Sequence, residues 1–185
     1  MKIPLLIFTL LGVPFLSKAQ EASVDKSTSG LQVGVKGMWL HNEGKIGNRF
    51  ALRSELGFDT NFYGGGAYDK NTFVMALVLT LEPRWYYNLN KRSLKGKDIS
   101  GNSGNFFSLK SSYTPDWFQI ANHDNITIPN QVSVIPTWGI RRNLGTKFNY
   151  ETGIGVGIRV IYWESISYWE RDTVLNLHLR IGYRF

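Results

Sequence analysis

The sequence lacks several features that would point to other fold classes. It contains no cysteine, so neither a disulfide framework nor a cysteine-ligated metal can contribute to the fold. Beyond residue 19, no apolar stretch approaches the roughly 18 residues that a transmembrane helix needs. We also find no helical periodicity of useful length. These absences exclude a disulfide scaffold and a helical membrane protein.

Histidine is also scarce, and this bears on metal binding and catalysis. The three histidines are His41, His123 and His178. A metal site brings several His, Cys or carboxylate ligands together, and no spacing in this chain matches one. We therefore expect no metal, no cofactor and no catalytic residue.

The first residues, "MKIPLLIFTLLGVPFLSKAQ", have the layout of a secretory signal peptide. Lys2 precedes an apolar stretch that is too short to span a bilayer as a helix, and Ser17 and Ala19 lie at −3 and −1 of a possible cut before Gln20. We expect a signal peptide over residues 1–19, an N-terminal segment over 20–29 that is a weak strand or a linker, and one domain over 30–185. Although the net charge is +7, an exported chain is not expected to bind nucleic acid.

The rest of the chain alternates between apolar and polar residues, which is typical of strands with two different faces. The last eleven residues, "LNLHLRIGYRF", place Leu177, Leu179, Ile181, Tyr183 and Phe185 on one face, and His178, Arg180 and Arg184 on the other. Similar alternation covers the stretches around 50–59, 73–87, 132–141 and 148–162, and weaker runs cover 31–40 and 106–113. The pattern predicts an all-β protein.

The composition of the two faces predicts the architecture. The apolar face is broad and aromatic at its ends, whereas the polar face mixes charges of both signs with glycine. A sheet with these faces fits an antiparallel up-and-down transmembrane β-barrel with lipid outside and polar residues inside. A soluble lipocalin-like barrel, the alternative, would carry apolar residues inward. We count seven strands and expect eight, with the eighth either within residues 20–30 or produced by a bend of 73–89 at Pro83.

The inward face is rich in charge, and two interpretations remain open. A lumen of eight strands is narrow enough for side chains to fill, so paired charges would close it. The arginine excess instead suggests a narrow path for anions or a polar ligand site. The predicted lumen charges are Lys36, Arg53, Glu55, Asp59, Glu82, Arg84, Arg141, Glu151, Arg159, His178, Arg180 and Arg184.

The final strand with its terminal phenylalanine resembles the carboxy-terminal signature of small, eight-stranded bacterial outer-membrane β-barrels. The residues that carry the signature are Leu177, Leu179, Ile181, Tyr183 and Phe185. The resemblance implies a location in the outer membrane, contact with its lipids, and recognition by the barrel-insertion machinery. Some barrels of this type modify lipid A through a His, a Ser and an acidic residue. Here His123 has Asp124 beside it but no adjoining serine, so we expect no enzyme.

The connections predict an orientation and a role. With Phe185 on the periplasmic side, residues 143–147 and 89–104 lie there too, and loops 62–71, 114–130 and 164–172 lie at the cell surface. The basic residues of the periplasmic rim either bind lipid phosphates or another acidic partner, or are only solvated. They are Lys91, Arg92, Lys95, Lys97, Arg141, Arg142 and Lys147. We expect a structural or surface-binding role through the outer loops. A narrow anion-preferring channel is the alternative, followed by a lipid A-modifying enzyme.

Overall fold

The computed structural model describes residues 22–63, 72–122 and 128–185. Strands make up most of this part of the chain. They are β1 (Ser27–Gly34), β2 (Gly37–Lys45), β3 (Phe50–Tyr63), β4 (Thr72–Trp85), β5 (Asn105–Thr114), β6 (Gln119–Ala121), β7 (Asn130–Leu144), β8 (Phe148–Trp163) and β9 (Tyr168–Arg184). The helical elements are α1 (Leu89–Leu94), η1 (Ser100–Asn102) and η2 (Glu164–Ile166).

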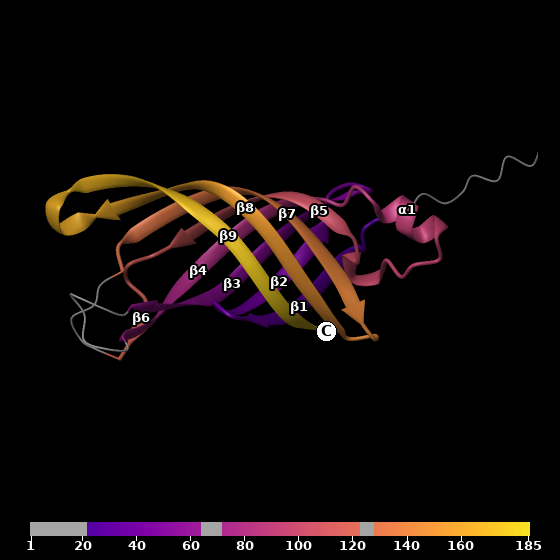
Figure 1. Ribbon diagram of the computed structural model, residues 1–185, viewed down its shortest axis with the longest axis horizontal. Helices are drawn as coiled ribbons and strands as arrows, with labels where there is room; N and C mark the ends of the chain where they lie inside the picture. Colours follow the sequence, from indigo (N-terminus) through magenta and orange to yellow (C-terminus); the bar gives the residue numbers. More distant parts are fainter. Residues whose placement is uncertain (1–21, 64–71, 123–127) are drawn as a thin grey trace, which may run out of the picture.

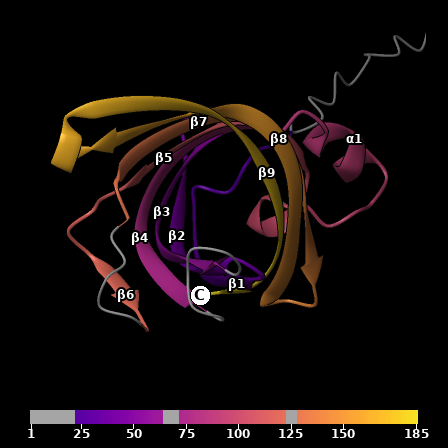
Figure 2. The same cartoon turned by 60° about the vertical axis from the view of Figure 1, so that its left-hand side comes forward.

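Eight of the strands form a closed antiparallel barrel. The strand order is β3-β2-β1-β9-β8-β7-β5-β4, and the pairing of β3 with β4 closes the ring. The ring is visible around a common lumen in Figure 2. The short β6 pairs with β4 beyond the end of β5 and so continues the wall at that position. The predicted eight-stranded, all-β, antiparallel barrel is confirmed.

The eighth strand arises at a turn that the sequence interpretation missed. Residues 31–40, interpreted as one weak strand, contain the end of β1, a turn, and the start of β2. Gly37 begins β2 with φ = +143°, a backbone conformation that glycine adopts easily and other residues do not. The proposed bend at Pro83 is wrong, because β4 runs continuously to Trp85. The other alternative, a first strand within residues 20–30, is met only in part, because β1 begins there at Ser27 but continues to Gly34.

The two ends of the barrel differ. One end, which we call the capped end, carries residues 22–26, α1, η1, the turn between β7 and β8, and Phe185 (Figure 1). The other end, the loop end, carries β6 and η2. The grouping of the connections is as expected, but two of them are more structured. Residues 89–104, expected to be a loop, contain α1 and η1, and residues 168–172, also expected to be a loop, belong to β9.

The capped end closes the barrel with side chains. Val24, Ala51, Tyr86, Leu89 and Phe106 form a buried apolar cluster there. Hydrogen bonds join the N-terminal residues to η1 in this cap. The Asp25 backbone N–H donates to Asn102 Oδ1 at 2.8 Å, and the Gly101 N–H donates to Asp25 Oδ2 at 2.7 Å. No helix among the described residues is both long and apolar enough to cross a bilayer.

Candidate functional site: the barrel lumen

Strand register places opposite charges next to one another around the inside of the barrel. On one side, Arg53 of β3 lies between Glu43 of β2 and Glu82 of β4. On the other side, Glu151 of β8 lies between Arg141 of β7 and Arg180 of β9. Because directly opposed cross-strand residues are neighbours on one face of a sheet, the pairing alone builds an alternating ring of charge.

Glu151 is the carboxylate at the centre of this ring. Arg84 donates to both of its oxygens, with Nη1–Oε2 at 2.9 Å and Nη2–Oε1 at 2.8 Å. Arg141 adds Nε–Oε2 at 2.8 Å and Nη2–Oε2 at 2.7 Å. Arg53 Nη1 and His178 Nε2 each lie 3.6 Å from a carboxylate oxygen. The Glu151 side chain is fully buried, so it neutralises several guanidinium groups away from water.

Glu43 is a second hub, closer to the capped end. Its Oε1 accepts hydrogen bonds from Tyr86 OH at 2.8 Å and from Asn102 Nδ2 at 2.6 Å. Its Oε2 lies 3.1 Å from Arg141 Nη1 and 3.6 Å from Arg84 Nη1. This carboxylate therefore joins the charged ring to the cap.

The ring ends toward the loop end in a third pair. Arg180 Nη1 donates to Glu55 Oε1 at 2.9 Å and to Oε2 at 3.2 Å. Arg53 Nε also donates to Glu55, and Arg53 Nη2 donates to Gln32 Oε1 at 2.6 Å. The Arg180 guanidinium lies 3.8 Å from the centre of the Trp39 ring, a cation–π contact that covers its other face.

Four arginines and four glutamates thus form one buried network, which we call the charge network. Its members are Glu43, Arg53, Glu55, Glu82, Arg84, Arg141, Glu151 and Arg180. Their side chains are at most a few per cent exposed. A buried charge is costly unless it is paired and hydrogen-bonded, and the equal numbers of the two signs meet that condition.

Seven of the twelve predicted lumen charges belong to this network: Arg53, Glu55, Glu82, Arg84, Arg141, Glu151 and Arg180. His178 borders it through its contact with Glu151. The other four do not join it. Asp59 accepts a hydrogen bond from Trp39 Nε1 at 2.8 Å. Arg159 pairs with Asp172 at 2.6 Å, and both side chains are a third or more exposed.

The two remaining predictions need correction for a physical reason. Lys36 does not lie on a strand face, because it belongs to the turn between β1 and β2, and its side chain is exposed. Arg184 is the last residue of β9 and lies at the rim, where its Nη2 donates to the Thr146 carbonyl oxygen at 2.7 Å. Alternation assigns a face to a residue but does not say how far along the barrel it lies.

Sequence reasoning missed Glu43 and His41. Both face inward from β2 and are almost completely buried. The signal was present: apolar residues occupy odd positions through Val35 and even positions at Met38 and Leu40, so the pattern changes phase across the turn. After the turn, the even positions of β2 face outward and the odd positions face inward. The inward residues are Trp39, His41 and Glu43.

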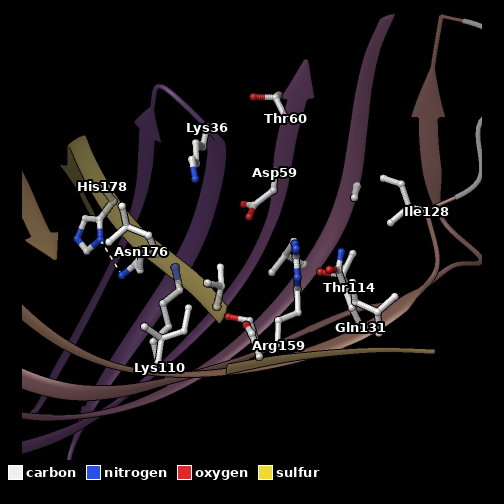
Figure 3. Close-up of a pocket in the computed structure, with 18 of the residues that line it drawn as sticks. Lys36, Asp59, Thr60, Lys110, Thr114, Ile128, Gln131, Arg159, Asn176 and His178 are labelled. Atoms are coloured by element: carbon white, nitrogen blue, oxygen red, sulfur yellow. Dashed lines mark hydrogen bonds between the residues drawn. The ribbon is translucent and has the colours of Figure 1, made fainter. Parts of the chain in front are cut away.

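A cavity lies between the charge network and the loop end, with a volume of about 310 Å³. Figure 3 shows Lys36, Lys110, Arg159, Asp59 and His178 around it. The wall also carries inward-facing apolar side chains from three strands, namely Val78, Ile135 and Ile161. Arg180 and Trp39 contribute to the lining at its inner end. The lumen is therefore filled with side chains toward the capped end and hollow toward the loop end.

The histidines do not gather into a catalytic or metal-binding group in the described part of the chain. His178 Nδ1 lies 3.4 Å from the Asn176 amide nitrogen, and its Nε2 contacts Glu151. His123 and the neighbouring Asp124 lie outside the described residues. Across residues 22–63, 72–122 and 128–185, no cluster of three or more His, Cys, Asp or Glu could hold a metal ion.

The outer wall of the barrel is apolar. Among the predicted signature residues, Leu177, Leu179, Ile181 and Phe185 are 58–72% exposed and point away from the lumen. Near the capped end, aromatic rings on adjacent strands touch: Phe50–Trp85 at 6.3 Å, Trp85–Phe107 at 6.2 Å and Phe148–Tyr183 at 5.3 Å. Near the loop end, Tyr162 and Trp169 lie 4.6 Å apart.

The basic rim predicted from the sequence borders a shallow groove at the capped end. Lys91, Arg92, Lys95, Lys97 and Arg142 line it with Tyr87, Asn88 and Asn105. In the adjacent connection, the Asn143 amide donates to Asp98 Oδ2 at 2.6 Å, and this hydrogen bond lowers the pKa of the Asp98 carboxyl. Arg141 belongs to the charge network instead, because it faces the lumen.

No protein-family model and no curated protein sequence matches the chain. A solved structure of a major outer membrane protein from Thermus thermophilus is similar in fold, with 14% sequence identity and a TM-score of 0.39. The match covers 87% of this chain and 100% of that chain.

Proposed function

We propose that this chain is an integral β-barrel protein of the bacterial outer membrane, closed by its charge network and serving a structural or surface-binding role. The observation that carries the proposal is the contrast between the two sides of one closed sheet. Charged groups are buried inside, and large apolar side chains are exposed outside. A bilayer favours this arrangement, since closure satisfies the backbone groups and the apolar wall contacts lipid.

The aromatic side chains support a membrane position. Rings of Trp, Tyr and Phe are favoured at both membrane interfaces. Contacting rings lie on the outer wall near the capped end, and a second group lies near the loop end. Leu79, Ile154 and Leu177 lie on the outer wall between these groups and are 41–60% exposed.

The orientation follows from the carboxy-terminal signature. Recognition of Leu177, Leu179, Ile181, Tyr183 and Phe185 by the insertion machinery would place the capped end in the periplasm and the loop end at the cell surface. Export through a signal peptide over residues 1–19 agrees with this topology, because the N-terminal segment lies at the capped end. Outer-membrane lipids are then the immediate partners of the barrel.

Contact with a surface ligand is proposed at the loop end, through loops 62–71, 114–130 and 164–172. Its described part exposes Trp117, Ile120, Ile166 and Trp169, which are 52–69% exposed. Exposed aromatic and apolar residues on loops are common at contact sites. Residues 64–71 and 123–127 of these loops lie outside the described part of the chain.

The alternative is a narrow anion-preferring channel, favoured by the cationic lining of the cavity. The experiment that separates the two is conductance across a planar bilayer after verified insertion. We expect no steady conductance, because the charge network and the apolar cluster of the cap fill the lumen below the cavity. A stable, anion-selective conductance would overturn the proposal in favour of the channel.

A further inference from the structure

The wall of the barrel is incomplete beside the cavity. Strand β9 pairs with β8 along residues 168–183 but with β1 only along residues 180–184. The pairing of β3 with β2 reaches no further than Asp59, opposite Gly37 at the start of β2, while β3 continues to Tyr63 with β4 as its partner. Within the part of the chain that the structure describes, no strand fills the space between residues 168–179 of β9 and residues 60–63 of β3.

This gap, which we call the wall notch, begins at the turn between β1 and β2 and extends from there toward the loop end. A hydrogen bond holds this turn against β3, since the Lys36 carbonyl oxygen accepts from the Thr60 N–H at 2.6 Å. The β8–β9 hairpin reaches the far end of the molecule in Figure 1. Outward-facing Leu175 and Leu177 belong to the stretch of β9 beside the notch and also border the cavity. The notch is therefore bordered by apolar residues of the outer wall.

The charge balance of the cavity is positive. Arg180 and Arg159 have carboxylate partners in Glu55 and Asp172. Lys110 projects into the cavity from β5, is half-buried, and makes no hydrogen bond or ion pair with any described residue. Asp59 is the carboxylate of the cavity lining, and it attracts Lys110, as do Glu55 and Glu82, without forming an ion pair with it. A poorly solvated ammonium that no carboxylate contacts directly is unfavourable, so an anion bound beside Lys110 would be stabilised.

We propose that the cavity binds a single-chain amphiphile with a carboxylate head, whose chain leaves through the wall notch toward the lipid. The head lies beside Lys110, and Val78, Ile135 and Ile161 offer apolar contact to the first part of the chain. The volume of about 310 Å³ is at the small end of the range of ~300–1,000 Å³ found for ligand pockets, which suits one chain. This inference adds a ligand class to the proposed membrane barrel and rests on it.

The absence of cysteine from the chain allows a direct test. Ser133 lines the cavity, whereas Ser111 faces away from the lumen on a neighbouring strand. Single variants Ser133→Cys and Ser111→Cys, inserted in phosphatidylcholine vesicles, are labelled with a thiol reagent in the presence of decanoate or of decanol. We expect decanoate to slow labelling of Ser133→Cys saturably, with decanol and Ser111→Cys showing no such effect.

Charge variants then test the head-group contact. Lys110→Met in the Ser133→Cys background should weaken decanoate protection roughly tenfold or more, as expected for the loss of a charge-assisted hydrogen bond. Lys97→Met, an exposed lysine at the capped end, should leave the protection unchanged. Equal protection by decanol, or full protection in Lys110→Met, would overturn the inference.

Insertion is verified first by heat-dependent gel migration, so the two proposals fail separately. A protein that does not insert contradicts the membrane barrel. A protein that inserts normally but shows no decanoate protection contradicts only the binding site.

Discussion

The charge network makes a strong prediction about Glu151. Its carboxylate accepts four contacts of 2.7–2.9 Å from Arg84 and Arg141 and lies 3.6 Å from Arg53. Glu151→Gln keeps the shape of the side chain but removes its charge. The three guanidinium groups would then share fewer carboxylates in a water-poor interior. Removing one partner of a buried ion pair typically costs about 3–5 kcal/mol. We expect Glu151→Gln to lower the free energy of unfolding by that amount.

The assay is reversible urea unfolding of the barrel refolded in phosphatidylcholine vesicles, followed by tryptophan fluorescence. Asp172→Asn is the matched control, because it removes the same charge from an ion pair that is a third or more exposed. Exposed pairs contribute only about 0–1 kcal/mol. If Glu151→Gln is destabilised no more than Asp172→Asn, the network does not hold the lumen together as we argue.

Three further variants test the wall, the pairing and the signature. Leu179→Arg should cost about 2–4 kcal/mol in vesicles if the residue lies near mid-membrane, whereas Ile166→Arg on η2 should cost roughly 0–1 kcal/mol; equal costs would contradict the assigned faces. Gly30→Ala should destabilise the barrel by about 1–3 kcal/mol, because its Cβ would lie 2.6 Å from the Tyr183 carbonyl oxygen. Gly44→Ala, with open space around its Cβ, serves as the control, and equal unfolding energies would contradict the pairing of β1 with β9. Phe185→Ser should lower barrel assembly in cells while leaving unassisted refolding in vesicles nearly unchanged; unimpaired assembly in cells would contradict recognition by the insertion machinery.

The sequence predicted the barrel because one physical rule applies to every strand. Side chains alternate across a sheet, so a residue such as Leu177 identifies the outer face and Arg180 the inner one. What the pattern could not locate was the turn at Lys36 and Gly37. Apolar residues continue across it, and only the shift from odd to even positions marks it. That shift also concealed Glu43, a hub of the charge network.

Other features were beyond the reach of a local pattern. Alternation does not reveal that Arg180 forms an ion pair with Glu55 while Lys110 forms none with any described residue. Ion pairing depends on which strands are neighbours around the ring. The cap was also missed. Its helix α1 is six residues long, too short to give a periodic signal, and it is held by contacts with residues far away in the sequence, such as Val24.

The central claim is that this chain is a closed barrel that lies in the outer membrane. Its most direct test is fractionation of cells that express the protein, followed by electrophoresis of heated and unheated samples of each fraction. We predict that the protein appears in the outer-membrane fraction and migrates faster when unheated, because the closed barrel resists the detergent. A soluble periplasmic protein whose migration does not change on heating would contradict the account.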